Sequence, residues 1–227
     1  MNVHRPAGQR GRTTHGTRTR LCSFSSGDYV DTDWMGFGAL RQLNEEHLPA
    51  GATVASQRVA NMELLALVLD GVLMRGDVTL AAGALAWTGA GHASDTPVET
   101  AGADGARVLR IAIQPGRVNL PPAAAIRRAD TAADTWTLLA GPDAGPDVLP
   151  LRQQTWLRQV RLSPAGRVDL TLDPSQRHWL QVLRGAVTID GWAMTSGDGA
   201  GWSDEALAAD LVAGADGATA LLLTLPR

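Results

Sequence analysis

Residues 51–71, GATVASQRVANMELLALVLDG, have the spacing of a metal-binding segment of a β-barrel but lack its ligands. Such a segment carries two histidines, one residue apart, between a glycine and a glutamate. Here Gly51 and Glu63 hold the outer places, whereas Gln57 and Val59 occupy the inner pair. Because valine has no lone pair and a neutral amide oxygen is a weak ligand for iron or copper, we expect no transition-metal site here.

The five histidines of the chain, at positions 4, 15, 47, 92 and 178, do not replace that pair. His92, with Asp95 nearby, could converge with Gln57, and His47 could join them only if the loop before Pro49 folded inward. A site of two histidines and one carboxylate needs one more imidazole than this. We therefore predict neither a resident metal nor another cofactor, since a set of weak neutral ligands rarely retains an ion.

Cys22 is the only cysteine, which excludes an intramolecular disulfide. One interpretation is a small, buried, apolar residue on a strand. The other is a redox-responsive thiol, because Arg20 lies two residues away and would favour the thiolate if the segment is extended.

The charges divide the chain into a basic start and an acidic body. Five of the 20 arginines fall in the first twenty residues, where no acid occurs, which leaves 15 arginines against 23 acids in the rest. We predict a basic, partly flexible arm over residues 1–20. The acidic body disfavours nucleic-acid binding, because it would repel a phosphate backbone. No run of eighteen apolar residues is present and no apolar segment follows the first arginines, so we expect a cytoplasmic protein without a membrane span.

After residue 20, short β-compatible runs alternate with turn signals. Leu64–Leu69 and Val108–Ile113 are such runs, and Asp70-Gly71 and Asp190-Gly191 are such turns. This spacing favours an all-β sandwich or barrel.

The two halves of the chain share this pattern. Residues 64–73, LLALVLDGVL, parallel residues 179–189, WLQVLRGAVTI: a strand, a small turn and a returning strand. Residues 116–150 between them are rich in Pro, Ala and Asp. We therefore predict a first barrel over residues 21–115, a connecting segment over 116–150 and a second barrel over 151–227.

The chain resembles the pirin-like bicupins, the family that also contains bacterial quercetin 2,3-dioxygenases. In the first half, the resemblance is carried by His15-Gly16, Ser23-Phe24-Ser25, Tyr29, Asp31, Met35-Gly36-Phe37, Leu40-Arg41, Asn44-Glu45, Met62-Glu63 and Val68-Leu69-Asp70-Gly71. In the second half it is carried by Trp179-Leu180-Gln181-Val182, Gly185, Val187-Thr188-Ile189, Gly191, Ser196, Asp198-Gly199, Asp204-Glu205 and Leu225-Pro226.

The resemblance implies two cupin-type β-barrels, each a double-stranded β-helix, packed together with few short helices. It also implies a metal in the first barrel of active members, held by a His-x-His pair, a third histidine and a glutamate two residues later. The first pair falls on Gln57 and Val59. Glu63 has a mostly structural counterpart in this family, so we expect it to face solvent or to be hydrogen-bonded.

The second pair of ligand positions falls in Gly91-His92-Ala93-Ser94-Asp95-Thr96. Ungapped from the glycine, the two positions are Ser94 and Thr96; with one deletion they are Ala93 and Asp95. In either alignment, at most one of the four family ligands is kept in kind.

Three functions remain open. The favoured one is a bicupin without the metal site that binds a small molecule in its first barrel, senses one or contacts a protein partner. The pocket candidates are the former ligand positions: Gln57, Val59, His92, Ala93, Ser94, Asp95 and Thr96. The second is a metal-dependent, quercetin 2,3-dioxygenase-like oxygenase. The third is a metal-independent acid–base enzyme that uses His92 and Asp95. The sequence fixes no oligomeric state.

Overall fold

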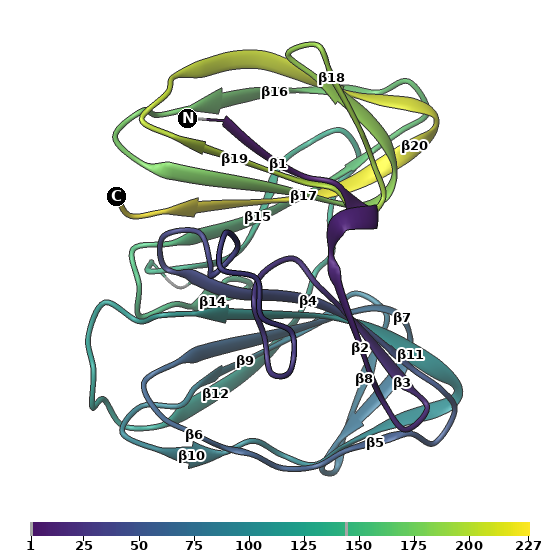
Figure 1. Cartoon of the computed structure of the whole chain (residues 1–227), viewed down its shortest axis with the longest axis vertical. Coiled ribbons are helices and arrows are strands. Elements are labelled where there is room, and N and C mark those ends of the chain that lie inside the picture. The colour runs from purple at the N-terminus through teal and green to yellow at the C-terminus, as the bar shows by residue number, and fades with distance from the viewer. Residues whose placement is uncertain (1, 144) are drawn as a thin grey trace.

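The structure, a computed structural model, describes residues 2–143 and 145–227. Figure 1 shows two β-barrels stacked on each other: the chain begins at the edge of the second barrel, passes to the first and then returns to the second. The predicted all-β, two-barrel architecture is confirmed. In the described residues the single helix is a 3₁₀ turn, η1 (Ala7–Gln9), and no helix is long and apolar enough to cross a membrane.

The first barrel is a nine-stranded sheet with a two-stranded ribbon beside it. The main path runs β12-β9-β7-β11-β4-β3-β2, while β5 pairs with β11 and β8 pairs with β7. The strands are β2 (Gly11–His15), β3 (Arg18–Cys22), β4 (Leu40–Leu48), β5 (Thr53–Val54), β7 (Glu63–Arg75), β8 (Val78–Ala81), β9 (Ala84–Gly89), β11 (Glu99–Ile113) and β12 (Ala123–Arg128). The ribbon joins β6 (Arg58–Val59) to β10 (Ser94–Asp95).

The second barrel is another nine-stranded sheet. Its path runs β1-β19-β17-β20-β15-β13-β14, while β16 pairs with β20 and β18 pairs with β17. The strands are β1 (Asn2–Arg5), β13 (Thr137–Gly141), β14 (Leu149–Pro150), β15 (Trp156–Leu162), β16 (Arg167–Leu172), β17 (Arg177–Ile189), β18 (Trp192–Thr195), β19 (Gly199–Ser203) and β20 (Leu207–Leu225).

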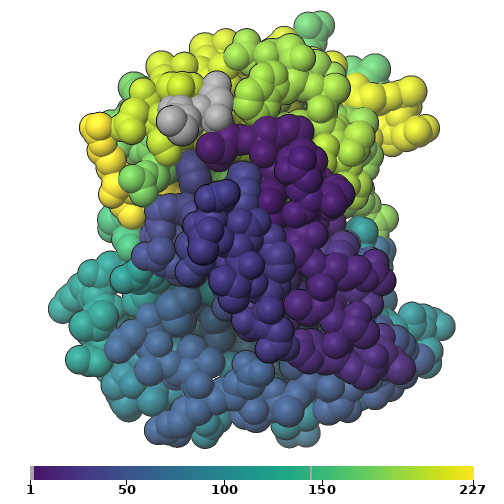
Figure 2. All heavy atoms as spheres, viewed as in Figure 1, coloured from purple at the N-terminus to yellow at the C-terminus, as the bar shows by residue number. Residues whose placement is uncertain are grey.

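The N-terminal segment differs from the arm predicted for residues 1–20. Strand β1 adds to the edge of the second barrel through β19, and after η1 the chain joins the first barrel as β2 and β3. Figure 2 shows these residues lying across one face of both barrels. Arg5 is only 3% exposed: its guanidinium lies 4.5 Å from the ring of Trp34 and donates to Tyr29 Oη at 2.7 Å. The segment therefore contacts both barrels through strand pairing. Its basic composition alone does not indicate this.

The connecting segment also differs from its prediction, because it supplies strands to both sheets. Strand β12 pairs with β9 of the first barrel, whereas β13 and β14 extend the second. The second sheet therefore begins before residue 151, and the first extends beyond residue 115.

The correspondence predicted between residues 64–73 and 179–189 is visible in the pairing, but the turn predicted inside each segment is wrong, because β7 and β17 run straight through it. Strand β7 pairs with β8, β9 and β11, and β17 pairs with β18, β19 and β20 in the same way. Gly71 and Gly185 hold equivalent places, with φ of 72° and 73°. Asp70 and Arg184, the residues before them, form an ion pair with each other across the two barrels.

The largest core lies between the barrels. Leu65 and Ile111 of the first barrel belong to the same buried cluster as Trp179 and Leu223 of the second. Because side chains alternate along a strand, the opposite face of β7 and β11 points into the first barrel. The inter-barrel core thus fixes which side chains face the interior of that barrel.

Candidate functional site

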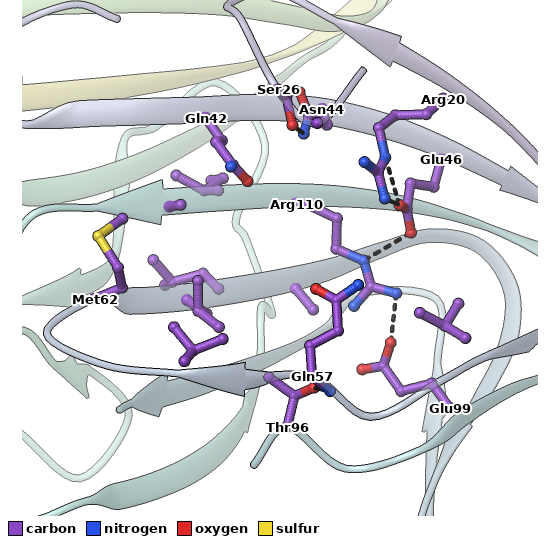
Figure 3. Close-up of a pocket in the computed structure, with 18 of the residues that line it drawn as sticks. Arg20, Ser26, Gln42, Asn44, Glu46, Gln57, Met62, Thr96, Glu99 and Arg110 are labelled. Atoms are coloured by element: carbon purple, nitrogen blue, oxygen red, sulfur yellow. Dashed lines mark hydrogen bonds and ion pairs between the residues drawn. The ribbon is translucent and has the colours of Figure 1, made fainter. Parts of the chain in front are cut away.

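A cavity of about 390 Å³ opens within the first barrel (Figure 3). Its walls are the inner faces of β4, β7 and β11, closed by the segments around β5, β6 and β10. Strand β4 contributes Gln42, Asn44 and Glu46, which are spaced by two residues and so share one face. Strand β7 contributes Leu64 and Ala66 by the same alternation. The volume is within the range of small-molecule pockets.

Four charged side chains form a chain of ion pairs at one end of this cavity. Glu46 accepts from Arg20 Nε at 2.9 Å through Oε1 and from Arg110 Nε at 3.0 Å through Oε2. Arg110 Nη2 in turn donates to Glu99 Oε2 at 2.5 Å. Figure 3 shows these side chains meeting from three different strand segments. Such charge-assisted bonds fix both carboxylates in the cavity wall.

Arg75 is the fifth charged side chain at this end of the cavity, and it has fewer hydrogen-bond partners than Arg110. Its Nη2 donates to Thr88 Oγ1 at 2.7 Å, and its Nε lies 3.5 Å from Glu99 Oε1. The Nε is buried and has no hydrogen-bond partner, and the side chain is only 10% exposed. Arg75 is therefore a buried cation that the surrounding carboxylates compensate incompletely.

The pKa shifts of these side chains reflect how fully each charge is compensated. Burial works against the charge of Glu46, but Arg110 and Arg20 prevail and hold the pKa of Glu46 below its usual range. Burial likewise opposes the charge of Arg110, and Glu99 and Glu46 raise its pKa nonetheless. Burial lowers the pKa of Arg75, and Glu99 does not fully offset it. Arg110 is thus well compensated, whereas Arg75 is not.

Three of the residues predicted from the sequence line the cavity: Gln57, Val59 and Thr96. The β6–β10 ribbon holds them together, because Gln57 N donates to Thr96 Oγ1 at 3.0 Å and Thr96 N donates to the Gln57 carbonyl at 2.9 Å. Figure 3 shows the amide of Gln57 extending toward Arg110. The structure therefore brings the first pair of positions beside Thr96.

The other four candidates, His92, Ala93, Ser94 and Asp95, lie outside the lining of this cavity. His92 is exposed, and its backbone N–H donates to the Leu120 carbonyl. Asp95 is exposed and pairs with Arg58 at 3.6 Å. No hydrogen bond or ion pair joins His92 to Asp95 in the part of the chain that the structure describes. His47 pairs instead with Glu45 at 3.1 Å; His47 is exposed, whereas Glu45 is buried.

Glu63 is fully buried and faces away from the cavity. Its Oε1 accepts from the backbone N–H of Arg152 at 2.5 Å, while Oε2 is buried without a partner. Burial raises the pKa of Glu63 to about 7, against the opposing hydrogen bond from Arg152. Of the two expected roles, the hydrogen-bonded one is confirmed and the solvent-facing one is wrong.

Cys22 is fully buried at the end of β3. Burial raises the pKa of the thiol, although Arg20 lowers it. This placement favours the interpretation as a small buried residue over that of a reactive thiolate.

The charged network was not predicted from the sequence; it consists of Arg20, Glu46, Arg75, Glu99 and Arg110. One signal was present. Arg110 interrupts the apolar run Val108–Ile113, and a charged residue in a buried strand requires partners. Its partners come from strands far away in the sequence, so their identity could not be read from spacing alone.

Comparisons with known proteins agree with this architecture. The family model described as "Quercetinase C-terminal cupin domain" matches residues 138–225. A quercetin 2,3-dioxygenase of Escherichia coli strain K12 is 30% identical over 213 residues, which cover 89% of this chain and 90% of that protein. The chain belongs to the pirin-like family.

Two further relatives place the chain among pirin-like proteins over nearly its whole length. The pirin-like protein YhaK of E. coli strain K12 is 28% identical over 225 residues, covering 91% of this chain and 92% of that one. The crystal structure of the bacterial pirin YhhW from E. coli in complex with nickel(II) superposes with a TM-score of 0.91, at 28% identity and with full coverage of both chains.

The residues of this pirin-like chain do not fit a nickel or iron site. Within residues 2–143 and 145–227, no three His, Cys, Asp or Glu side chains converge in a way that could hold a metal ion. The cavity offers an amide, a hydroxyl and an aliphatic group at Gln57, Thr96 and Val59, where imidazoles would suit such ions. Its two carboxylates, Glu46 and Glu99, are engaged by arginines.

Proposed function

We propose that this pirin-like chain is a metal-independent, non-catalytic binding protein whose small-molecule ligand occupies the first-barrel cavity. The observation that carries the proposal is the donor set of that cavity. Three arginines are paired with its two carboxylates, and no imidazole lines it. Activation of O₂ needs a redox-active centre, and the side chains that line this cavity are poorly suited to holding one.

The cavity has the composition of a ligand site rather than of a packed core. Polar side chains meet at one end, and Met62, Leu64 and Val59 provide apolar wall. An apolar cavity with a few convergent polar groups is the usual form of a small-molecule pocket. The inter-barrel core backs β7 and β11 of this cavity, and a sensing role or a protein partner belongs to the same proposal. A cytoplasmic location remains a prediction from the sequence.

A quercetin 2,3-dioxygenase-like activity is the second candidate. It is favoured by the 30% identity to a protein of that name. The donor set opposes it, because that activity requires a bound redox-active centre. The acid–base alternative has less support, since His92 and Asp95 lie outside the cavity and are not paired.

The two candidates are separated by one assay. Protein purified without chelator is mixed with quercetin in oxygenated buffer, alone and after addition of one equivalent of Ni²⁺, Fe²⁺, Cu²⁺ or Mn²⁺. We expect oxygen uptake no faster than that of the same metal with quercetin and no protein. Uptake that depends on the protein and saturates at one metal per chain would establish the oxygenase instead.

A further inference from the structure

The cavity of the first barrel holds an unbalanced positive charge. The ionisable side chains that line it are three arginines and two glutamates, namely Arg20, Arg75, Arg110, Glu46 and Glu99. The five are joined by the contacts described above, so their charges act on one another as a group. At neutral pH the group carries one net positive charge.

The excess is local to Arg75. Glu46 accepts hydrogen bonds from both Arg20 and Arg110. Glu99 accepts a hydrogen bond of 2.5 Å from Arg110, whereas its distance to Arg75 is 3.5 Å. The Nε of Arg75 is buried without a hydrogen-bond partner. An uncompensated buried charge costs several kcal/mol, so buried ions in proteins are normally paired. Arg75 lines the cavity, so a negative group bound there would lie close to its guanidinium and balance the charge, although Nε itself is buried.

Residues at the mouth do not supply that group. Asp95 is engaged by Arg58 at 3.6 Å, and both side chains are mostly exposed. Asp28, next to the lining residue Gly27, is 79% exposed and pairs with His15 at 3.5 Å. Among the described residues, neither of these two acids at the mouth compensates Arg75, so we look for the balancing charge in a bound ligand.

The rest of the cavity limits the kind of anion. The charged side chains gather at one end, and Met62 lies at the other (Figure 3). Leu64, Val59 and Ala112 add apolar surface to the lining. A highly hydrated inorganic ion would leave this apolar part unfilled, whereas a molecule with one anionic group and an apolar body would meet both ends.

We propose that the first-barrel cavity binds a small organic monoanion, a carboxylate with an apolar body, whose charged group is held by Arg75 and Arg110. This inference rests on the function proposed above, because it assigns a ligand class to the same cavity. The planar guanidinium group matches a carboxylate in geometry.

The test compares two probes of nearly the same shape, 3-phenylpropionate and 3-phenylpropionamide, by isothermal titration calorimetry at pH 7 and low salt. The wild-type protein should bind the carboxylate at least tenfold more tightly than the amide. Arg75→Gln should lower carboxylate affinity at least tenfold and leave amide affinity unchanged. Arg167→Gln, on the exposed surface of the second barrel, is the control and should change neither.

Because Arg75 is buried, a second variant avoids dependence on its folding. Gln57→Glu places a carboxylate in the cavity from an exposed position, so it should supply the missing charge internally and abolish the preference for the carboxylate. Gln57→Met is the matched neutral variant and should keep that preference.

Equal affinity for the two probes, or no binding of either, would overturn the monoanion inference and leave the metal-independent proposal standing. A carboxylate preference that survives in both Arg75→Gln and Gln57→Glu would overturn it as well. By contrast, metal-dependent oxygen uptake in the quercetin assay would overturn the proposed function, whatever these titrations show.

Discussion

Arg110 and Glu46 form a buried ion pair across the wall of the first barrel, with Nε donating to Oε2 at 3.0 Å. The Glu46 side chain is only 3% exposed, and Arg20 binds its other oxygen. This pair joins β4 to β11 and lies in the cavity to which the family resemblance assigns metal chemistry. Because of this ion pair, the stability of the first barrel depends on the charge state of Glu46.

Glu46→Gln should destabilise the protein by roughly 2–4 kcal/mol at pH 7, because it leaves two mostly buried guanidinium groups short of a negative partner. The folded-state pKa of Glu46 lies below its unfolded value, so its contribution is present above about pH 4.5 and is lost as the pH falls through the lower, folded value. Urea unfolding measured from pH 7 down to pH 3.5 should therefore show the difference between wild type and variant shrinking only at the acid end.

Asp210→Asn is the control for that series. Asp210 pairs with Arg167 at 3.7 Å on the surface of the second barrel, where both side chains are substantially exposed. Exposed pairs contribute little, so this variant should unfold like the wild type. An equal loss in both variants would contradict the special role given to Glu46.

Glu63→Gln should stabilise the protein at alkaline pH. The pKa of Glu63 is raised to about 7 in the folded chain, so ionisation progressively costs stability between about pH 4.5 and pH 7. The cost reaches about 3 kcal/mol above pH 7, since each unit of pKa shift corresponds to about 1.4 kcal/mol. Gln keeps an acceptor for the Arg152 N–H and cannot ionise.

The measurement is the free energy of unfolding of both proteins at pH 4.5 and pH 8. The two free energies of unfolding should agree at pH 4.5, and the variant should be the more stable protein at pH 8. A variant that is less stable at pH 8 would show that Glu63 is held ionised in the folded chain.

Gly71→Ala should be strongly destabilising, whereas Gly76→Ala should cost much less. Both residues have positive φ, 72° and 57°, a region that costs a residue with a Cβ about 1–2 kcal/mol. A Cβ on Gly71 would also lie 2.2 Å from the Gly105 carbonyl oxygen, while one on Gly76 meets nothing within 4 Å. Thermal unfolding of the two variants separates the clash from the shared backbone strain, and equal losses would contradict the tight approach of β7 to β11.

Three histidines introduced at Gln57, Val59 and Thr96 should create a Ni²⁺ site. These side chains meet on the β6–β10 ribbon, and the imidazoles would supply the donors that the natural residues lack. We expect the triple variant to bind Ni²⁺ at least a hundredfold more tightly than the wild type by calorimetric titration. The double variant at Gln57 and Val59 should gain less, and an unchanged triple variant would show that the three positions do not converge.

The sequence predicted the two-barrel fold well because strand and turn signals are local. Gly71 and Gly185 were visible as equivalent positions, but the turns predicted there are wrong: each glycine lies at positive φ inside one continuous strand, β7 or β17, beside a register shift. The start of the chain was predicted less well: its arginines indicated a partly flexible arm, yet Arg5 is buried against Trp34. That contact depends on chain segments brought together only by the fold.

The candidate site shows the same limit. Gln57 and Val59 were located by their distance from Gly51 and Glu63, a purely local pattern. The Arg75–Glu99 contact needs the pairing of β7 with β11 before it can be seen. A local pattern and the family resemblance thus predicted the former ligand positions, but only the fold revealed which charged side chains line the cavity beside them.

The central claim is that the first barrel works without a metal, and metal analysis of the purified protein tests it most directly. Protein produced in medium supplemented with Fe, Ni, Cu and Mn, and purified without chelator, should contain well under 0.1 equivalent of any of these metals per chain, about the level of a non-specific surface ion. A content close to one equivalent of a single metal, lost on replacement of cavity residues but kept in surface variants, would contradict the account.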